Sequence, residues 1–326
     1  MQQYRDTNYA AVSAALHARE AHLLTQALSE RMLEAPTAEE SCKILIECGY
    51  PPLEHCTLEE VETLLALSRA ELYREVAVLA PDKRIVELFQ LKYDYHNAKL
   101  ALKAKLTGED VSRLVIGCGR YDASALLRGE RGMLSSRMGR AMAQAEKEAE
   151  GGDIRQAELT LDRACFEEMS ELAGATGNDF LIGYVALQID AIDLRTLVRA
   201  QRMGASDELL SAALLPGGHI PAEQLKTARG DCLAELTRGS ALSAAGELAA
   251  ATLGGSGSLT AFERACDDAL VRYLQRARRT PFGPEVIVGY LSAKEAEFTA
   301  VRTILSGKLA GLSAEDIRAR LRLSYL

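Results

Sequence analysis

Apolar residues recur at helical spacing along most of the chain. In three segments they step by three, four or seven residues, which places them along one side of a helix. Such a band is typical of a helix that packs one face against neighbouring helices. The pattern therefore predicts three long helices. Their bands are Leu88, Leu91, Tyr95, Ala98, Leu102 and Leu106; Tyr184, Leu187, Ala191, Leu194 and Val198; and Ile287, Leu291, Phe298, Val301 and Leu305.

Residues that start helices precede several of the apolar segments. Thr37-Ala-Glu-Glu40 and Thr57-Leu-Glu-Glu60 are capping boxes, in which a threonine and a glutamate three residues later satisfy free amide groups at a helix start. The stretches between the prolines are rich in Ala, Leu, Glu, Arg and Gln, which favour helix. Strand-like patterns are confined to the isolated segment Arg113–Gly117. The sequence predicts an all-α fold.

A short motif recurs at intervals of nearly 100 residues. Leu161-Asp-Arg-Ala-Cys165 reappears as Phe262-Glu-Arg-Ala-Cys266, at an offset of 266 − 165 = 101. The pair Arg69-Ala70 occupies the place of Arg163-Ala164, 94 residues earlier. Because internal repeats decide the architecture of a chain, this recurrence suggests related units.

The ends of the three predicted long helices support the repeat. Each ends in a basic residue, four intervening residues, a glycine and a new helix start. A glycine just past a helix often adopts a left-handed conformation. This order predicts three helical units, 1–116, 117–214 and 215–326. The basic residues and glycines are Lys103 with Gly108, Arg199 with Gly204, and Arg302 with Gly307, at offsets of 199 − 103 = 96 and 302 − 199 = 103; the new starts are at Asp110, Ser206 and Ser313.

Charge and hydropathy exclude two classes of partner. The formal net charge is −8, whereas nucleic-acid binding needs clustered basic residues. The basic stretch Arg276–Arg279 follows Asp267 and Asp268, which favours a solvated helix end. The longest apolar run, Phe180–Ile189, is too short to span a membrane, and the first residues lack the pattern of a signal peptide. We expect a protein that is soluble or held on a membrane only through partners.

The cysteines predict neither disulfides nor a metal site. Their number is odd and no short spacing pairs them, which is typical of reduced thiols in a cytosolic protein. Cys48, His55 and Cys56 form the only local cluster, and it offers three ligands where structural zinc sites use four. The seven cysteines are Cys42, Cys48, Cys56, Cys118, Cys165, Cys232 and Cys266.

Glycine-rich segments do not match nucleotide-binding motifs. Gly307-Lys308 is followed by Leu309 instead of Ser or Thr, and Gly254–Ser258 has no lysine. Gly117-Cys-Gly119-Arg120 lacks the third glycine of a dinucleotide site. His96 has no matching nucleophile and acid, so we expect it to pack. The sequence thus predicts no catalytic, cofactor-binding or metal-binding residues.

Lys103, Arg199 and Arg302 allow two interpretations. They could form a ring of positive charge that binds a partner. They could instead stabilise helix C-termini through the helix macrodipole, which requires no partner. We favour the second interpretation.

Several segments spread over nearly the whole chain share the residue order of one protein family. The most distinctive is Tyr93-Asp-Tyr-His-Asn-Ala-Lys99, which is similar to a Tyr-Asp-aromatic-x-Asn-x-Lys helix. The family is that of the C subunits of V-type and A-type ATPases, which includes the eukaryotic d subunit. The chain departs from it at Asp193, where Asn is common, and at Ser13, which replaces a frequent Asn. The other segments are Tyr9–Leu24, Ala35–Tyr50, Asp190–Arg195 with Arg199, Tyr290–Arg302 with Gly307 and Lys308, and Tyr325.

This resemblance implies a fold, a function and partners. The fold would be three similar three-helix units around a pseudo-threefold axis, forming a funnel. The chain would be a non-catalytic central-stalk component of a rotary V/A-type ATPase, a socket that couples the central shaft to the membrane proteolipid ring for proton or sodium transport. ATP would be made or hydrolysed on the A and B subunits. Implied partners are the D and F subunits of the shaft and the ring, with no nucleic acid and no nucleotide. The chain would be a monomer within this hetero-oligomeric complex, cytoplasmic and peripheral to the membrane.

A second class of function is a helical-repeat adaptor that binds protein partners outside any rotary motor. The usual repeat period of such proteins is about 20 to 50 residues. The units predicted here are about twice as long, which favours the rotary ATPase.

We predict that the isolated protein does not bind Mg-ATP, because its glycine motifs lack the residues that hold phosphates. Calorimetric titration with Mg-ATP should give no saturable heat. Micromolar binding would contradict this prediction.

Overall fold

Long helices joined by short ones make up the protein in the computed structural model, which describes residues 6–323 and 325. Within these residues there is no strand, so the all-α prediction is confirmed. The chain forms two compact units, residues 1–83 with 271–326 and residues 84–270. The division into three units at 116/117 and 214/215 stays a prediction.

The first unit is discontinuous in sequence, because its N-terminal helices pack with the last long helix of the chain. The 3-10 helices of this unit are η1 (Asp6–Tyr9), η2 (Leu45–Cys48) and η4 (Gln275–Arg279). Its α-helices are α1 (Ala10–Glu20), α2 (Gln26–Glu34), α3 (Ala38–Ile44), α4 (Leu58–Leu79), α15 (Pro284–Leu309) and α16 (Ala314–Arg320).

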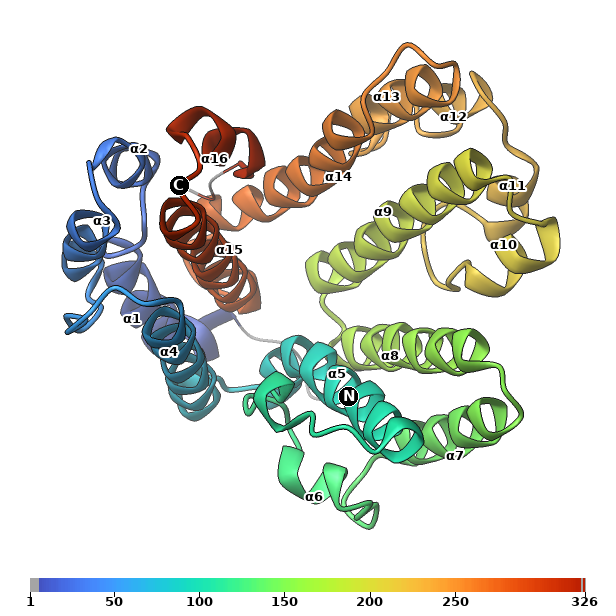
Figure 1. Ribbon diagram of the computed structural model, residues 1–326, viewed down its shortest axis with the longest axis horizontal. Helices are drawn as coiled ribbons and strands as arrows, with labels where there is room; N and C mark the ends of the chain where they lie inside the picture. The colour runs from blue at the N-terminus through green and yellow to red at the C-terminus, as the bar shows by residue number, and fades with distance from the viewer. Residues whose placement is uncertain (1–5, 324, 326) are drawn as a thin grey trace. The chain divides into compact units, whose positions relative to one another are not determined.

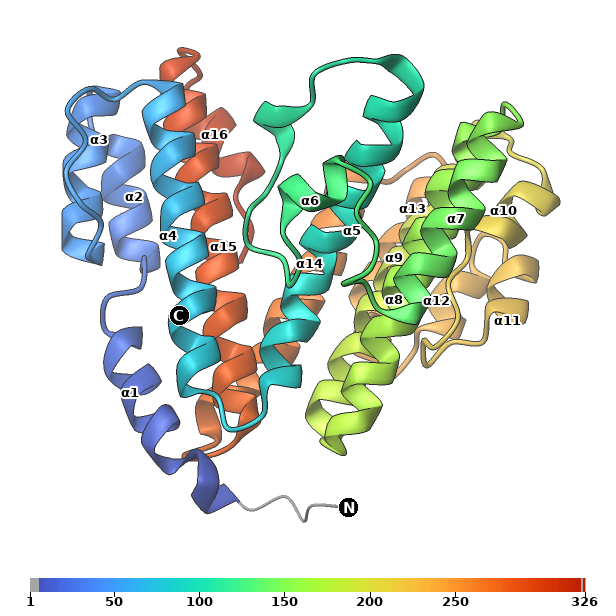
Figure 2. The same cartoon turned by 90° about the horizontal axis from the view of Figure 1, so that it is seen from below.

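Helices α4 and α15 lie side by side and antiparallel in this unit (Figure 1 and Figure 2). Arg302 donates to Glu62 over 2.6 Å, and the hydroxyl of Tyr73 donates to Glu295 over 2.7 Å. The apolar band of α15 faces the interior, since Ile287, Leu291, Phe298, Val301 and Leu305 are all fully buried. The pair of long helices is therefore the core of the unit.

The second unit is a series of antiparallel helix pairs. α7 packs on α8, and α8 packs on α9 (Figure 1). Helix α5 (Lys83–Thr107) starts at the boundary of this unit, and α14 (Leu259–Leu274) ends just beyond it. The other helices are η3 (Ser112–Leu114), α6 (Ala123–Leu127), α7 (Ser136–Glu150), α8 (Ile154–Thr176), α9 (Asp179–Met203), α10 (Asp207–Ala213), α11 (Ala222–Thr227), α12 (Cys232–Leu236) and α13 (Ser243–Leu253).

Local sequence explains where most of these helices begin. The hydroxyls of Thr37 and Thr57 accept the amides of Glu40 and Glu60, each over 3.2 Å, as the capping boxes predict. The apolar bands of α5 and α9 are buried as expected, except for Leu106 at the last turn of α5, which is partly exposed. The helical periodicity therefore predicts both the elements and the faces that they bury.

Two of the three predicted glycine caps are confirmed, and the third lies four residues further on. Gly108 and Gly204 follow α5 and α9 with φ of 69° and 64°. Gly307 lies inside α15, whereas Gly311 follows that helix with φ of 73°. Gly307 has another cause: a Cβ there would lie 2.7 Å from Cγ1 of Ile317, so glycine lets α16 pack closely on α15.

The predicted starts Asp110, Ser206 and Ser313 each lie two residues after a left-handed glycine, and a short helix follows each of them. Ser206 and Ser313 accept the amides of Leu209 and Asp316 and so cap α10 and α16. Asp110 accepts the amide of Ser112, where η3 begins.

The position of Gly311 predicts its response to substitution. Gly311→Ala should lower the free energy of unfolding by about 1–2 kcal/mol, because an L side chain is strained at this positive φ. Gly311→Asn should lower it less, since Asn adopts the left-handed region more readily. Urea unfolding of the two variants beside the wild type measures the difference. Equal stability of all three proteins would refute the assignment of Gly311 as the helix cap.

Candidate functional site

A buried carboxylate in the middle of α5 holds the chain that follows this helix. Asp94 is fully buried, and its Oδ2 accepts Nε of Arg120 over 2.8 Å, while its Oδ1 accepts the amide of Tyr121 over 3.2 Å. A Cβ on Gly119 would overlap Asp94 Oδ1, so the close approach requires glycine. Arg120 also donates to Glu168 of α8 over 3.0 Å. This carboxylate therefore fixes a loop and, through Arg120, a second helix.

The same arrangement recurs on α9, at the offset of 96 that the sequence predicts (94 + 96 = 190). Asp190 is buried and accepts the amides of His219 over 3.1 Å and Ile220 over 2.9 Å. The His219 ring also bonds to Asp190 over 2.9 Å. A Cβ on Gly218 would overlap Asp190 Oδ1, as at the first site.

A second polar side chain, one turn further along each helix, holds the same loops. Asn97 accepts the amide of Ile116 over 3.0 Å and donates to its carbonyl over 2.8 Å. Its counterpart Asp193 (97 + 96 = 193) accepts the amide of Leu215 over 2.9 Å. Burial and the nearby charge of Asp190 raise the pKa of Asp193 to about 7, against the opposing effect of the Leu215 amide.

Helix α15 has a carboxylate at the corresponding distance from its end. Glu297 lies 311 − 297 = 14 residues before its left-handed glycine, as Asp94 does (108 − 94 = 14). It is buried, and it accepts the amide of Leu24 over 2.7 Å and the hydroxyl of Tyr50 over 2.5 Å. These two partners come from the N-terminal segment instead of a following loop, and Lys294, on the preceding turn of α15, also donates to Glu297 over 2.5 Å. Burial and the charge of Glu297 raise the pKa of the Tyr50 hydroxyl.

The three basic residues singled out in the sequence are each paired within the chain. Lys103 lies 3.4 Å from Glu109, Arg199 donates to Glu263 of α14, and Arg302 donates to Glu62 of α4. They lie before the last helical turn, whose basic residues are Lys105, Arg202 and Lys308. Because the macrodipole acts mainly within the last turn, the preferred interpretation of these three residues is wrong. Two of them instead join neighbouring long helices.

Lys308, in the last turn of α15, binds the C-terminus of a different helix, α2. Its Nζ donates to the carbonyl of Leu33 over 2.9 Å and to that of Ala35, where α2 ends. A cation at this position satisfies carbonyls that have no partner within their own helix.

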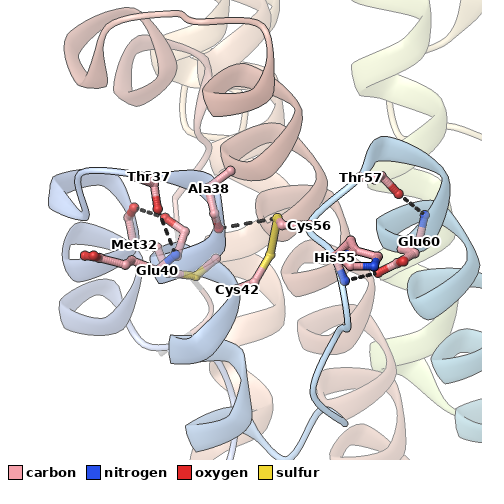
Figure 3. The surroundings of a disulfide bond; sticks show 10 residues. Met32, Thr37, Ala38, Glu40, Cys42, His55, Cys56, Thr57 and Glu60 are labelled. Atoms are coloured by element: carbon pink, nitrogen blue, oxygen red, sulfur yellow. Dashed lines mark hydrogen bonds between the residues drawn. A yellow bond between two sulfur atoms is a disulfide. The ribbon is translucent and has the colours of Figure 1, made fainter.

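The expectation of seven reduced thiols is wrong for two of them. Cys42 on α3 and Cys56 before α4 form a disulfide (Figure 3). Cys56 is therefore no ligand for a metal beside Cys48 and His55. Spacing alone did not reveal this pair, because the turn around Gly49 (φ of 83°) brings the two segments together. Cys48, Cys165, Cys232 and Cys266 are not part of a disulfide.

The remaining residues singled out in the sequence make contacts within the chain. His96 bonds through Nε2 to the carbonyl of Leu114 over 3.1 Å, and Gly257 sits tightly against the backbone of Thr252 in the turn before α14. Asp267, which precedes the exposed arginines of η4, accepts a hydrogen bond from Nη2 of Arg195. None of the described helices is both long and apolar enough to cross a bilayer.

Large apolar side chains are exposed at the helix ends of the second unit. Leu106, Ile154 and Met203 lie at the end of α5, the start of α8 and the end of α9. Lys99 pairs with Asp162 and Tyr95 with Glu168, so α5 and α8 are antiparallel. The three side chains therefore lie at one end of these helices. Met203 is 76% exposed and Ile154 53%.

The first unit exposes apolar side chains at both ends of its long helices. Leu58 and Leu309 lie at one end of the antiparallel pair α4 and α15, and Val78 and Phe282 lie at the other. Val78 is 81% exposed and Phe282 46%. Single exposed apolar side chains are common on protein surfaces, and in this chain several of them lie at helix ends.

The sequence model of ATP synthase (C/AC39) subunits matches residues 12–320, which is most of the chain. The chain belongs to this family. It is 24% identical to the C subunit of the V-type sodium ATPase of Enterococcus hirae, over 97% of this chain and 99% of that protein. It is 27% identical to the C subunit of the A-type ATP synthase of Methanocaldococcus jannaschii, over 96% and 86% of the two chains. It is 26% identical to the C subunit of the V-type ATP synthase of Thermus thermophilus, over 93% and 94%.

The family assignment confirms the resemblance found in the sequence and makes this chain a subunit of a rotary ATPase. In a C/AC39 protein the buried carboxylates are therefore best understood as parts that hold the helices in place. They sit in the middle of α5, α9 and α15, far from the exposed helix ends.

The raised pKa of Asp193 predicts a pH-dependent stability for this C/AC39 protein. An unfolded aspartate has a pKa of about 3.9, so the folded protein binds the proton more tightly. The stabilising contribution of protonated Asp193 is then fully present below about pH 4 and is lost as the pH rises towards 7. Asp193→Asn keeps the acceptor for Leu215 without the charge. It should raise the free energy of unfolding by about 1–3 kcal/mol at pH 8 and make little difference at pH 4.

The reciprocal change at Asn97 is the matched control. Asn97→Asp should destabilise the protein at pH 8, because a buried charge replaces the amide that donates to Ile116. Denaturant unfolding between pH 4 and 8 measures both variants. A loss of stability in Asp193→Asn at pH 8 would contradict the raised pKa.

Proposed function

We propose that the chain is the non-catalytic central-stalk component of a rotary V/A-type ATPase. It is a socket that couples the central shaft, made of the D and F subunits, to the proteolipid ring in the membrane, and so serves proton or sodium transport. The observation that carries the proposal is the match to C/AC39 proteins over nearly the full length of both chains. In this proposal the chain is cytoplasmic, peripheral to the membrane and present as one copy.

The way in which the helices are held together supports a mechanical role. A part that transmits torque must resist sliding of its helices. Buried or half-buried hydrogen bonds join the helices in addition to apolar packing: α5 to α8 from Tyr95 to Glu168, α9 to α14 from Arg195 to the carbonyl of Glu263, and α4 to α15 from Tyr73 to Glu295. Such contacts are directional and hold the register, because slippage would leave buried polar groups without partners.

Exposed apolar side chains at helix ends support the presence of protein partners. Each unit ends in side chains such as Met203 or Val78, which remain mostly in water in the isolated chain. Covering them would add favourable apolar burial, about 25 cal/mol per Å². We propose that these ends contact the shaft and the ring, and that the units 1–116, 117–214 and 215–326 surround a pseudo-threefold axis to form a funnel.

Co-purification of the tagged chain from detergent-solubilised membranes tests the function directly. Mass spectrometry of the recovered material should identify the shaft proteins and the proteolipid. Recovery of the chain without any other ATPase component would contradict the proposal.

Charged substitutions at the helix ends should weaken assembly and leave the fold intact. We expect Ile154→Asp with Met203→Asp, and separately Val78→Asp with Phe282→Asp, to lower recovery of the assembled complex at least about tenfold, which corresponds to about 1.4 kcal/mol. The partner lost in each case identifies what that end contacts.

Leu67→Asp is the matched control for these variants. Leu67 is 66% exposed, but it lies in the middle of α4. Circular dichroism should show wild-type helix content for all three proteins, since exposed substitutions change stability little. Normal assembly of both helix-end variants would show that these ends are not docking surfaces.

A further inference from the structure

Cys42 and Cys56 lie where three parts of the first unit meet. Cys42 is in the last turn of α3, and Cys56 directly precedes Thr57, which caps α4. Their Cα atoms are 6.6 Å apart and both side chains are buried. Sγ of Cys56 also lies 3.3 Å from the carbonyl of Ala38 at the start of α3 (Figure 3). The bond therefore joins α3 directly to the start of α4.

The segment closed by this bond contains a contact to the core of the unit. Tyr50 lies within it, and its hydroxyl donates to Glu297 of α15. Cys48 also lies within it but is free. The closed segment is thus attached at three places: to α3, to α4 and, through Tyr50, to α15.

We propose that Cys42 and Cys56 are a reversible thiol–disulfide pair, whose oxidation closes residues 42–56 into a loop and stabilises the first unit. The reversibility rests on the proposed cytoplasmic location, because thiols there are kept reduced unless they are redox-active. The pairing itself rests on the structure alone.

The oxidant in this reaction is a small-molecule disulfide. The thiolate of one cysteine attacks a sulfur of this disulfide, which forms a mixed disulfide and releases one small thiol. The thiolate of the second cysteine then attacks the protein sulfur of the mixed disulfide, which forms the Cys42–Cys56 bond and releases the second small thiol. The two protons lost by the protein pass to the two released thiolates. The protein loses two electrons, and the small disulfide gains them.

Cys48, Cys165, Cys232 and Cys266 form no disulfide, in contrast to Cys42 and Cys56. Burial raises the pKa of Cys48 to about 11 and the pKa values of Cys165 and Cys266 to about 12, so these thiols stay protonated at neutral pH. Cys232 is exposed, but it lies in the other unit. It can form a mixed disulfide, whereas Cys42 and Cys56 lie close enough to each other to close a bond.

Mass spectrometry of the full-length chain tests the pairing. The protein is equilibrated with a glutathione buffer, oxidised or reduced, quenched with acid, and then denatured and alkylated. The oxidised sample should contain one internal disulfide, and peptide mapping should place it between Cys42 and Cys56. Cys48→Ser should keep this bond, whereas Cys42→Ser should abolish it. A bond involving Cys48, or only mixed disulfides with glutathione, would overturn the proposal.

Thermal unfolding of the same samples tests the consequence. The oxidised wild type should unfold at a temperature roughly 5–10 °C above the reduced wild type, because closing a loop of this length restricts the unfolded chain. Cys42→Ser should unfold at the same temperature in both buffers. Since oxidised and reduced wild type are compared directly, a variant that folds poorly does not affect the result. Equal unfolding temperatures of the two wild-type samples would overturn the stabilising role.

Both measurements use the isolated chain and no other component of the ATPase. A failure of this proposal is therefore distinguishable from a failure of the proposed stalk function. Loss of partners in the co-purification would leave the disulfide result unchanged.

Discussion

Carboxylates buried in the middle of the long helices hold the loops and segments that cross them. Removing a carboxylate from water is strongly unfavourable unless hydrogen bonds replace the lost hydration. Asp94, Asp190 and Glu297 each accept a hydrogen bond from a backbone amide, which replaces part of the lost hydration. The donating amides belong to segments that cross the helix. Glycines follow from the same constraint, because Gly119 and Gly218 let the backbone approach the carboxylate closely. Replacing one of these carboxylates would therefore leave several donors without their acceptor at once.

This arrangement suits a protein that transmits force. Apolar contacts are not directional, so helices held by them alone could shift along each other with little change in buried area. Hydrogen bonds from Arg120 to both Asp94 and Glu168 fix one relative position of α5 and α8. On α15, Glu297 fixes the N-terminal segment through Leu24 and Tyr50. The polar contacts thus decide how the helices are positioned, and apolar burial supplies most of the stability.

The helices and their buried faces could be predicted from sequence, because both depend on local spacing. The buried band of α9 and the caps at Thr37 and Thr57 are examples. Gly307 was misassigned because a basic residue followed by glycine looks the same whether the glycine ends a helix or admits a neighbour such as Ile317. The partners of the buried acids could not be predicted, since they lie up to 273 residues away in sequence, as for Glu297 and Leu24. The pairing of Cys42 with Cys56 depends in the same way on how α3 packs.

The contact of Lys308 with the end of α2 has a consequence for how the protein is made. Residues 1–83 complete their unit only with residues 271–326, and Lys308 supplies partners to carbonyls near residue 33. The ribosome adds 270 − 83 = 187 residues between these two parts. At about 5–20 residues per second, roughly 10–40 s pass before α15 emerges. During that time α4 lacks α15, the helix on which it mainly packs, so its apolar face stays incompletely covered while the nascent chain grows. The second unit, which is continuous in sequence, has all its residues before the first unit does.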